Sequence, residues 1–179
     1  MDATGPIVLL TDFGYQDHYA GVLRGVIASI APRCPLLDLT HGIEPQNILE
    51  GAFQLLQGYS FFPSKTIFVC VVDPGVGTRR MILCAKTKRY YFIAPDNGLL
   101  DPVLTREGDY EVRSLENPKF MKSPASSTFH GRDKMAPAAA HLAKSVRFFS
   151  QLGPRLHRIE PLAVPETIRT ETAVRGEIL

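Results

Sequence analysis

The sequence has no long apolar run, no closely spaced pair of cysteines and no large excess of charge of one sign. Its longest apolar runs, residues 7–10 and 67–72, are far shorter than the roughly 20 residues that a membrane-spanning helix needs. The 20 basic and 18 acidic residues leave a net charge of +2, which argues against a dedicated nucleic-acid-binding protein. The amino terminus has an acidic start and no long apolar segment, so we expect no secretory signal.

Cysteine is sparse, and its spacing excludes the common cysteine-based sites. Cys34, Cys70 and Cys84 form no CxxC pair, which predicts buried apolar residues in a reducing compartment rather than disulfides or zinc ligands. The cytoplasm is therefore the expected location. With 179 residues, 45% of them hydrophobic and 21% charged, the chain is long enough for one globular domain, or for one domain and the beginning of another.

Apolar patterning predicts strands and helices that alternate through the first half of the chain. Continuous apolar runs that end in turns are typical of strands buried on both faces, and apolar residues three and four apart are typical of covering helices. This alternation predicts an α/β fold with a largely parallel sheet covered by helices. We expect strands at 6–12, 36–39, 66–72, 81–85, 90–94 and 108–115, and helices at 19–30 (with Asp17 as N-cap), 46–59 and 138–149.

The character of the chain changes after Gly153. Residues 154–166 contain prolines and follow no regular pattern, which predicts a linker. Residues 167–179 alternate like the first strand of a further domain, and a lone strand is not a stable module. We expect an α/β catalytic domain at 1–153, a linker at 154–166 and the start of a truncated β domain at 167–179.

Polar residues follow four of the expected strands. Asp12, His41, Asp73 and Asp96 each lie where a strand ends and a turn begins. Taken singly, an aspartate in this position is most often a turn former. Because ligands of open α/β sheets bind outside the carboxyl ends of the strands, the four together predict a small-molecule site at one edge of the sheet.

The segment DPGVGTRR at 73–80 contains the sharpest local signal. Its proline and two glycines permit a tight reversal that returns Arg80 beside Asp73, where the two side chains would form a charge-assisted pair. A purely structural ion pair is the alternative. The segment lacks the third glycine of a dinucleotide fingerprint and the lysine of a P-loop.

His130 lies in a second cluster, SSTFHGRD at 126–133, shortly before the late helix. Pro137 suits the first turn of that helix, so His130 would lie near the positive end of the helix dipole and stay neutral near pH 7. A neutral imidazole there could accept a proton from water. The alternative is that His130 caps a turn and Asp133 caps the helix.

Five segments together resemble one family. LLTDFG (9–14), DLTHGI (38–43), VVDPGVGTRR (71–80), APDNGLL (94–100) and STFHGRD (127–133) are similar, in order and approximate spacing, to the N-terminal domain of S-adenosyl-L-methionine (SAM) hydrolases that form adenosine. These SAM hydroxide adenosyltransferases are related to the fluorinase and chlorinase. Lys134 departs from the family pattern, which usually has an aliphatic residue after GRD.

The resemblance implies hydrolysis of SAM to adenosine and L-methionine, with no cofactor and no metal. It implies a catalytic set of Asp73, Arg80 and His130 and a ribose-binding Asp12, and Asp96 and Asn97 are further candidates for substrate binding. It also implies a Rossmann-like N-terminal domain, a C-terminal β-barrel domain that this chain lacks or only begins, and a homotrimer.

Two other functions stay open at this point. One is a metal-dependent phosphohydrolase or nucleotidase, against which stand the loose spacing of the ligands and the repulsion that Arg80 would exert on a cation. Its ligands would be Asp12, Asp17, His41, Asp73 and His130. The other is a nucleoside-binding remnant without catalysis. We expect neither nucleic-acid nor membrane partners.

Overall fold

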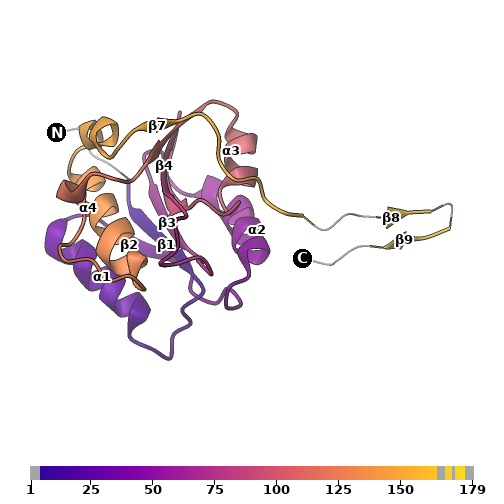
Figure 1. The fold of residues 1–179 in the computed structure, drawn as a ribbon, viewed down its shortest axis with the longest axis horizontal. Coiled ribbons are helices and arrows are strands. Elements are labelled where there is room, and N and C mark those ends of the chain that lie inside the picture. The colour runs from indigo at the N-terminus through magenta and orange to yellow at the C-terminus, as the bar shows by residue number, and fades with distance from the viewer. Residues whose placement is uncertain (1–4, 165–167, 171, 176–179) are drawn as a thin grey trace.

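A seven-stranded mixed sheet, with helices on both faces, forms the centre of the computed structural model, which describes residues 5–164, 168–170 and 172–175 (Figure 1). The strand order is β2-β1-β3-β5-β4-β6-β7. The elements of this sheet and its helical layers are β1 (Ile7–Thr11), α1 (Tyr19–Ile30), β2 (Leu36–Thr40), α2 (Ile48–Gly58), β3 (Ile67–Val71), β4 (Ile82–Thr87), β5 (Tyr91–Pro95), α3 (Asp101–Glu107), β6 (Tyr110–Ser114), α4 (Ala136–Lys144) and β7 (Arg155–Leu156).

The sheet is parallel in its first half and antiparallel in its second. Strands β2, β1, β3 and β5 pair in parallel, whereas β4 pairs antiparallel with β5 and β6, and β7 pairs antiparallel with β6. Strands β4 and β5 are joined by only three residues, a connection too short for a parallel crossover. The predicted α/β fold is confirmed, and five of the seven strands run in one direction.

Each face of the sheet buries its own apolar core. Helices α1 and α4 pack on one face, with Leu23 and Leu142 among the buried side chains. Helices α2 and α3 cover the other, where Leu55 and Leu104 are buried. Strands β1 and β3 are buried along their whole length, as their unbroken apolar sequences predict.

Two local predictions are wrong in detail, and one helix was not predicted. His18, not Asp17, is the N-cap of α1. The helix expected at 138–149 is divided into α4, which begins at Ala136, and a 3-10 turn (Val146–Gln151), because the extended backbone of Ser145 ends α4. A π-helical turn (Gly131–Met135) precedes α4. Helix α3 was not predicted, since its seven residues are too few to show a clear helical period.

The segment expected to be a linker begins with a strand of the main sheet. Arg155 and Leu156 pair with β6. Further along, Ile168–Arg169 (β8) and Val174–Arg175 (β9) pair antiparallel with each other, whereas residues 167, 171 and 176–179 of the predicted second domain lie outside the described part. The division into an N-terminal domain, a linker and a truncated β domain stays a prediction.

The burial predicted for the three cysteines is confirmed for two of them. Cys70 and Cys84 are buried, free thiols, and Cys34 is a free, half-buried one. Within the described ranges, no helix has the length and apolar character needed to cross a bilayer.

Candidate functional site

The parallel strands bring the four predicted polar residues to one edge of the sheet. Asp12, His41, Asp73 and Asp96 follow β1, β2, β3 and β5, which run side by side in the same direction. The sequence-based prediction of their common location is therefore confirmed. Their surroundings differ, however, and the differences decide which of them can meet a ligand.

Asp73, Arg80 and His130 form one hydrogen-bonded cluster. Arg80 Nε donates to Asp73 Oδ1 at 2.8 Å, and Arg80 Nη2 donates to the second carboxylate oxygen. The same Nη2 lies 2.9 Å from His130 Nδ1. The exposed fractions of the side chains are 4% for Asp73 and 10% for Arg80, and His130 is buried, so the cluster is largely withdrawn from water.

The Arg80 contact fixes where neutral His130 carries its proton. A guanidinium has donors but no acceptor, so His130 Nδ1 must accept, and the ring proton lies on Nε2. Burial, followed by the charges of Lys134 and Arg80, holds the pKa of His130 below its ordinary value. The imidazole is therefore neutral near pH 7, as the sequence predicted.

Two glycine-containing segments bring this cluster together. Gly77 in the loop after β3 has φ of +83°, and a Cβ there would lie 2.8 Å from the carbonyl oxygen of Ser127. A side chain would thus separate this loop from the segment that leads to His130. Gly131 begins the π-helical turn and packs on β3, where a Cβ would lie 3.3 Å from Val71 Cγ1.

The capping alternative for His130 and Asp133 is wrong. His130 precedes the π-helical turn without making a side-chain cap. Asp133 lies inside that turn, fully buried, where it accepts from Arg132 Nε and Nη2 at 2.7 Å and from the Ser126 amide at 2.8 Å. Asp133 therefore anchors the segment before His130, and the ring of His130 is left for the cluster.

Asp12 lines one cavity together with Asp73 and His130 of the cluster. Its Oδ2 accepts the backbone N–H of Gln46 at 2.9 Å, and Oδ1 accepts from no other residue that the structure describes. Burial raises the pKa of Asp12, and the charge of Asp73 raises it further, against the lowering effect of the Gln46 amide. Gln46 has φ of +68°, a conformation unusual for a residue with a side chain.

One cavity gathers three of the six predicted site residues. Asp12, Asp73 and His130 line it, and Arg80 supports it from behind through Asp73 and His130. The remaining walls come from the residues around them, namely Phe13, Val71, Val76, Thr128, Phe129 and Gly131. The cavity thus combines apolar walls with a few convergent polar groups, the usual character of a small-molecule site.

The comparison with known proteins assigns the chain. A family model described as the SAM hydroxide adenosyltransferase N-terminal domain matches residues 7–153. The chain belongs to this family.

Members of the family and a solved structure resemble the chain over most of its length. An (R)-S-adenosyl-L-methionine hydrolase of Thermus thermophilus is 36% identical over 97% of this chain and 69% of that protein, and one of Salinispora arenicola is 36% identical over 93% and 66%. A fluorinase of Actinoplanes sp. is 29% identical over 80% and 56%. An uncharacterized conserved protein of Thermotoga maritima has a crystal structure that superposes with a TM-score of 0.86 at 41% identity, over 91% of this chain and 63% of that one. The chain thus spans 56% to 69% of the lengths of these relatives.

Asp96 and Asn97 do not line the cavity that holds the cluster. Asp96 Oδ1 accepts the backbone N–H of Glu160 at 2.8 Å. Asn97 Nδ2 donates to the carbonyl of Val72 at 2.9 Å, at the end of β3. Both side chains therefore hold other parts of the chain at this edge, a use that their sequence context did not indicate.

Sequence reasoning missed the aromatic walls of the cavity. Phe13 and Phe129 face each other edge to face with ring centroids 6.0 Å apart, and Tyr19 of α1 contacts both. The available signal was adjacency, because Phe13 follows Asp12 and Phe129 precedes His130 within the two family motifs.

The ligands suggested for a metal-dependent alternative are used elsewhere in part. His41 is fully buried between Thr11 and Asp38 rather than facing the cavity. Within the part of the chain that the structure describes, no three His, Cys, Asp or Glu side chains are grouped so that they could hold a metal ion.

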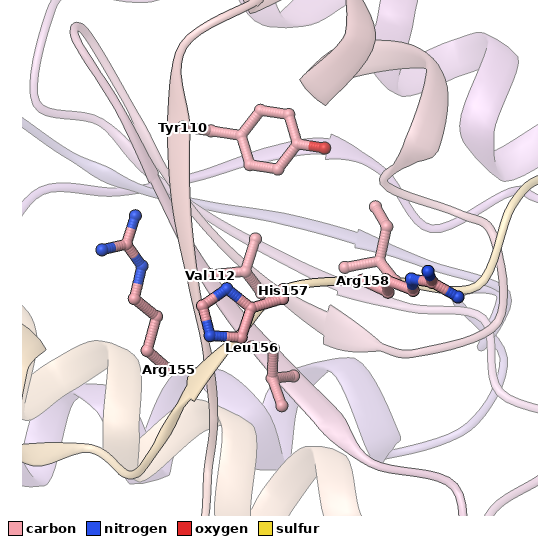
Figure 2. Close-up of a pocket in the computed structure, with 7 residues that line it drawn as sticks. Tyr110, Val112, Arg155, Leu156, His157 and Arg158 are labelled. Atoms are coloured by element: carbon pink, nitrogen blue, oxygen red, sulfur yellow. The ribbon is translucent and has the colours of Figure 1, made fainter.

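A second pocket lies at the other end of the sheet, along β6 and β7 (Figure 2). Tyr110, Arg155, His157 and Arg158 line it, and no carboxylate does. It contains none of the predicted site residues and stands apart from the cluster of Asp73, Arg80 and His130.

Proposed function

We propose that the protein hydrolyses SAM to adenosine and L-methionine without a metal or other cofactor, by attack of water or hydroxide on the 5′ carbon of the ribose. The observation that carries this proposal is the buried cluster of Asp73, Arg80 and His130 beside the cavity that Asp12 lines. The names of the Thermus and Salinispora relatives support the same substrate.

The chemistry requires little beyond a well-placed nucleophile. The sulfonium leaves as a neutral thioether, so neither a general acid nor a metal is needed for its departure. Oxygen forms a bond to the 5′ carbon as the carbon–sulfur bond breaks, and the proton of the water passes to solvent. The protein must hold the oxygen in line and exclude competing water.

The cluster offers hydrogen-bond donors for that oxygen. Nε2–H of His130 is a donor, and Nη1 of Arg80 has no partner among the described residues. Because His130 Nδ1 already accepts from Arg80, we infer that neutral His130 orients the nucleophile as a donor rather than taking its proton as a base. Asp73 orients Arg80, so that its remaining N–H groups can hold the attacking oxygen in place.

Asp12 is the proposed ribose-binding residue. A carboxylate accepts both ribose hydroxyls with its two oxygens better than a neutral side chain does. Its Oδ1 remains available, and Phe13 and Phe129 supply apolar walls beside it. Asp96 and Asn97 stay candidates for contacts with other parts of the substrate, and their present bonds to the chain favour a supporting part.

Several broader properties belong to the same proposal. The α/β domain at 1–153 would carry the catalytic set, and residues 154–166 would lead to a C-terminal β domain of which 167–179 are the start. Homotrimeric assembly and a cytoplasmic location complete the proposal, supported by family membership and by a cysteine content typical of reducing compartments.

The test is product analysis with the full-length protein. Purified protein is incubated with SAM, with and without EDTA, and adenosine and methionine are separated by chromatography. Adenosine formed in the presence of EDTA supports the proposal, whereas activity that requires added metal contradicts it. His130→Ala is expected to abolish turnover and to leave adenosine binding nearly intact, and equal loss of both would show that His130 is structural. Binding of adenosine without turnover by the wild type would identify a nucleoside-binding protein instead.

A further inference from the structure

His41 is one of the four polar residues at the sheet edge, but its side chain does not line the cavity. Its side chain is fully buried behind the cavity, and its Nδ1 lies 2.8 Å from the hydroxyl oxygen of Thr11. Its Nε2 lies 3.1 Å from Asp38 Oδ1, close enough for an electrostatic contact, and both of these buried atoms lack a hydrogen-bond partner in the described part of the chain.

The contacts around His41 favour one arrangement of protons. Nε2 lies 3.1 Å from a carboxylate oxygen of Asp38, which favours the ring proton on Nε2. Nδ1 then accepts from the Thr11 hydroxyl, whose oxygen also accepts the Phe13 N–H at 3.2 Å. A neutral imidazole with an accepting Nδ1 carries its proton on Nε2, which faces the carboxylate of Asp38. Burial, and then the charge of Arg24, keep the pKa of His41 below its ordinary value, so the ring is neutral.

Contacts on both sides of the His41 ring link α1 to the turn that carries Asp12. Arg24 of α1 forms an ion pair with Asp38 Oδ2. On the side of the Asp12 turn, Thr11 Oγ1 accepts the backbone N–H of Phe13, and the backbone carbonyl of His41 accepts the N–H of Gly14 at 2.8 Å. The turn that carries Asp12 is thus held on both sides by the pair of Thr11 and His41.

The loop that follows His41 also contacts Asp12. The chain runs from His41 to Gln46, whose amide donates to Asp12 Oδ2. The segment after β2 therefore makes two contacts with the Asp12 turn, one from His41 itself and one from Gln46. Loss of the hydrogen bond between Thr11 and His41 would free the turn. The sheet below the turn would remain, because β1 is buried along its whole length.

We propose that Thr11 and His41 are positioning residues for Asp12, and that their bond determines how strongly the site recognises ribose hydroxyls. The inference rests on the proposed function in one respect, namely that Asp12 binds the ribose. Neither residue touches the substrate. Their effect is on the orientation of one carboxylate.

The test compares two ligands and two matched variants of the full-length protein. Binding of adenosine and of 2′,3′-dideoxyadenosine is measured by calorimetry for the wild type, Thr11→Val and Thr11→Ser. Thr11→Val keeps the shape of the side chain and removes the hydroxyl, whereas Thr11→Ser keeps the hydroxyl. The preference for adenosine over the dideoxy ligand is expected to fall about tenfold in Thr11→Val, and to be retained in Thr11→Ser.

A purely structural role would lower stability without changing that preference. Unchanged preference in a folded Thr11→Val protein would therefore overturn the inference, and so would NMR detection of the Nδ1–H form of His41. In an Asp12→Asn background, Thr11→Val is expected to have no further effect on the preference. A wild type that does not distinguish the two ligands would instead overturn the proposed role of Asp12.

Discussion

At the scale of single residues, the candidate site is a set of hydrogen-bond directions. Arg80 can only donate, and this one property sets the proton of His130 on Nε2 and turns the ring into a donor. Protonation of His130 would place an N–H against Nη2 of Arg80 and break their contact. Activity is therefore expected to fall as the pH drops through the lowered pKa of His130.

Lys134 provides the test of this reasoning. Its charge is the second cause, after burial, of the lowered pKa of His130, with Arg80 third, while Asp73 and Asp133 act in the opposite direction. Lys134→Met is expected to raise the pKa of His130, so the acid limb of the kcat profile should move to higher pH.

Lys122→Met is the matched control for that variant. Lys122 lies 4.0 Å from Asp133 and is not among the charges that act on His130. An acid limb that stays in place in Lys134→Met, or that moves equally in Lys122→Met, would contradict the assignment of the limb to His130.

At the scale of elements, loops bring the site residues into contact, whereas the strands determine only the edge of the sheet at which these loops begin. The loop after β3 returns Arg80 to Asp73, and its close approach to Ser127 brings it beside the segment that ends in His130. The π-helical turn at Gly131–Met135 then points the ring at Arg80. Such turns are rare and frequently mark functional sites.

The approach at Gly77 can be tested against a glycine with a similar positive φ. Gly77 and Gly108 have φ of +83° and +77°, but only at Gly77 would a Cβ meet another segment, whereas nothing lies within 4 Å of one at Gly108. Gly108→Ala is expected to lower the free energy of unfolding by about 1–3 kcal/mol and to leave kcat unchanged.

Gly77→Ala should also displace the loop from Ser127, and therefore lower kcat as well as stability. Urea unfolding and initial rates measured on both variants separate the two effects. Equal kcat values for Gly77→Ala and Gly108→Ala would show that the loop contact does not matter for the site.

At the scale of the whole molecule, buried histidines should make stability depend on pH. Burial lowers the pKa of His41, His130 and His141. As the pH falls below the ordinary histidine pKa of about 6.5, the unfolded chain binds protons that the folded chain does not yet bind. The free energy of unfolding should therefore fall on acidification, by up to about 1.4 kcal/mol per pH unit for each such histidine.

Urea unfolding between pH 7.5 and 5.5 measures this slope, and the raised pKa of Asp12 acts on the slope in the opposite direction. His141 contacts Phe120 and lies outside the cavity, so His141→Gln should reduce the slope without changing activity near pH 7. A slope that is flat in the wild type, or equal in the variant, would contradict the burial of neutral imidazole at these positions.

The sequence by itself determined the α/β fold and the common edge of Asp12, His41, Asp73 and Asp96. These features follow from local rules, because apolar runs specify buried strands and parallel strands end at the same edge. The pairing of Asp73 with Arg80 could also be predicted from the sequence, because only a tight loop separates the two residues.

Only the tertiary structure decided which of these residues face the cavity. The contact of Arg80 with His130 joins residues 50 positions apart, and the bond of Asp96 to Glu160 joins residues 64 apart. No local period encodes such contacts, because they depend on how loops from different strands pack over the sheet edge. Residues at similar sequence positions therefore have different surroundings. Asp73 belongs to the cluster, the side chain of His41 is buried against Thr11, and Asp96 binds the backbone of Glu160.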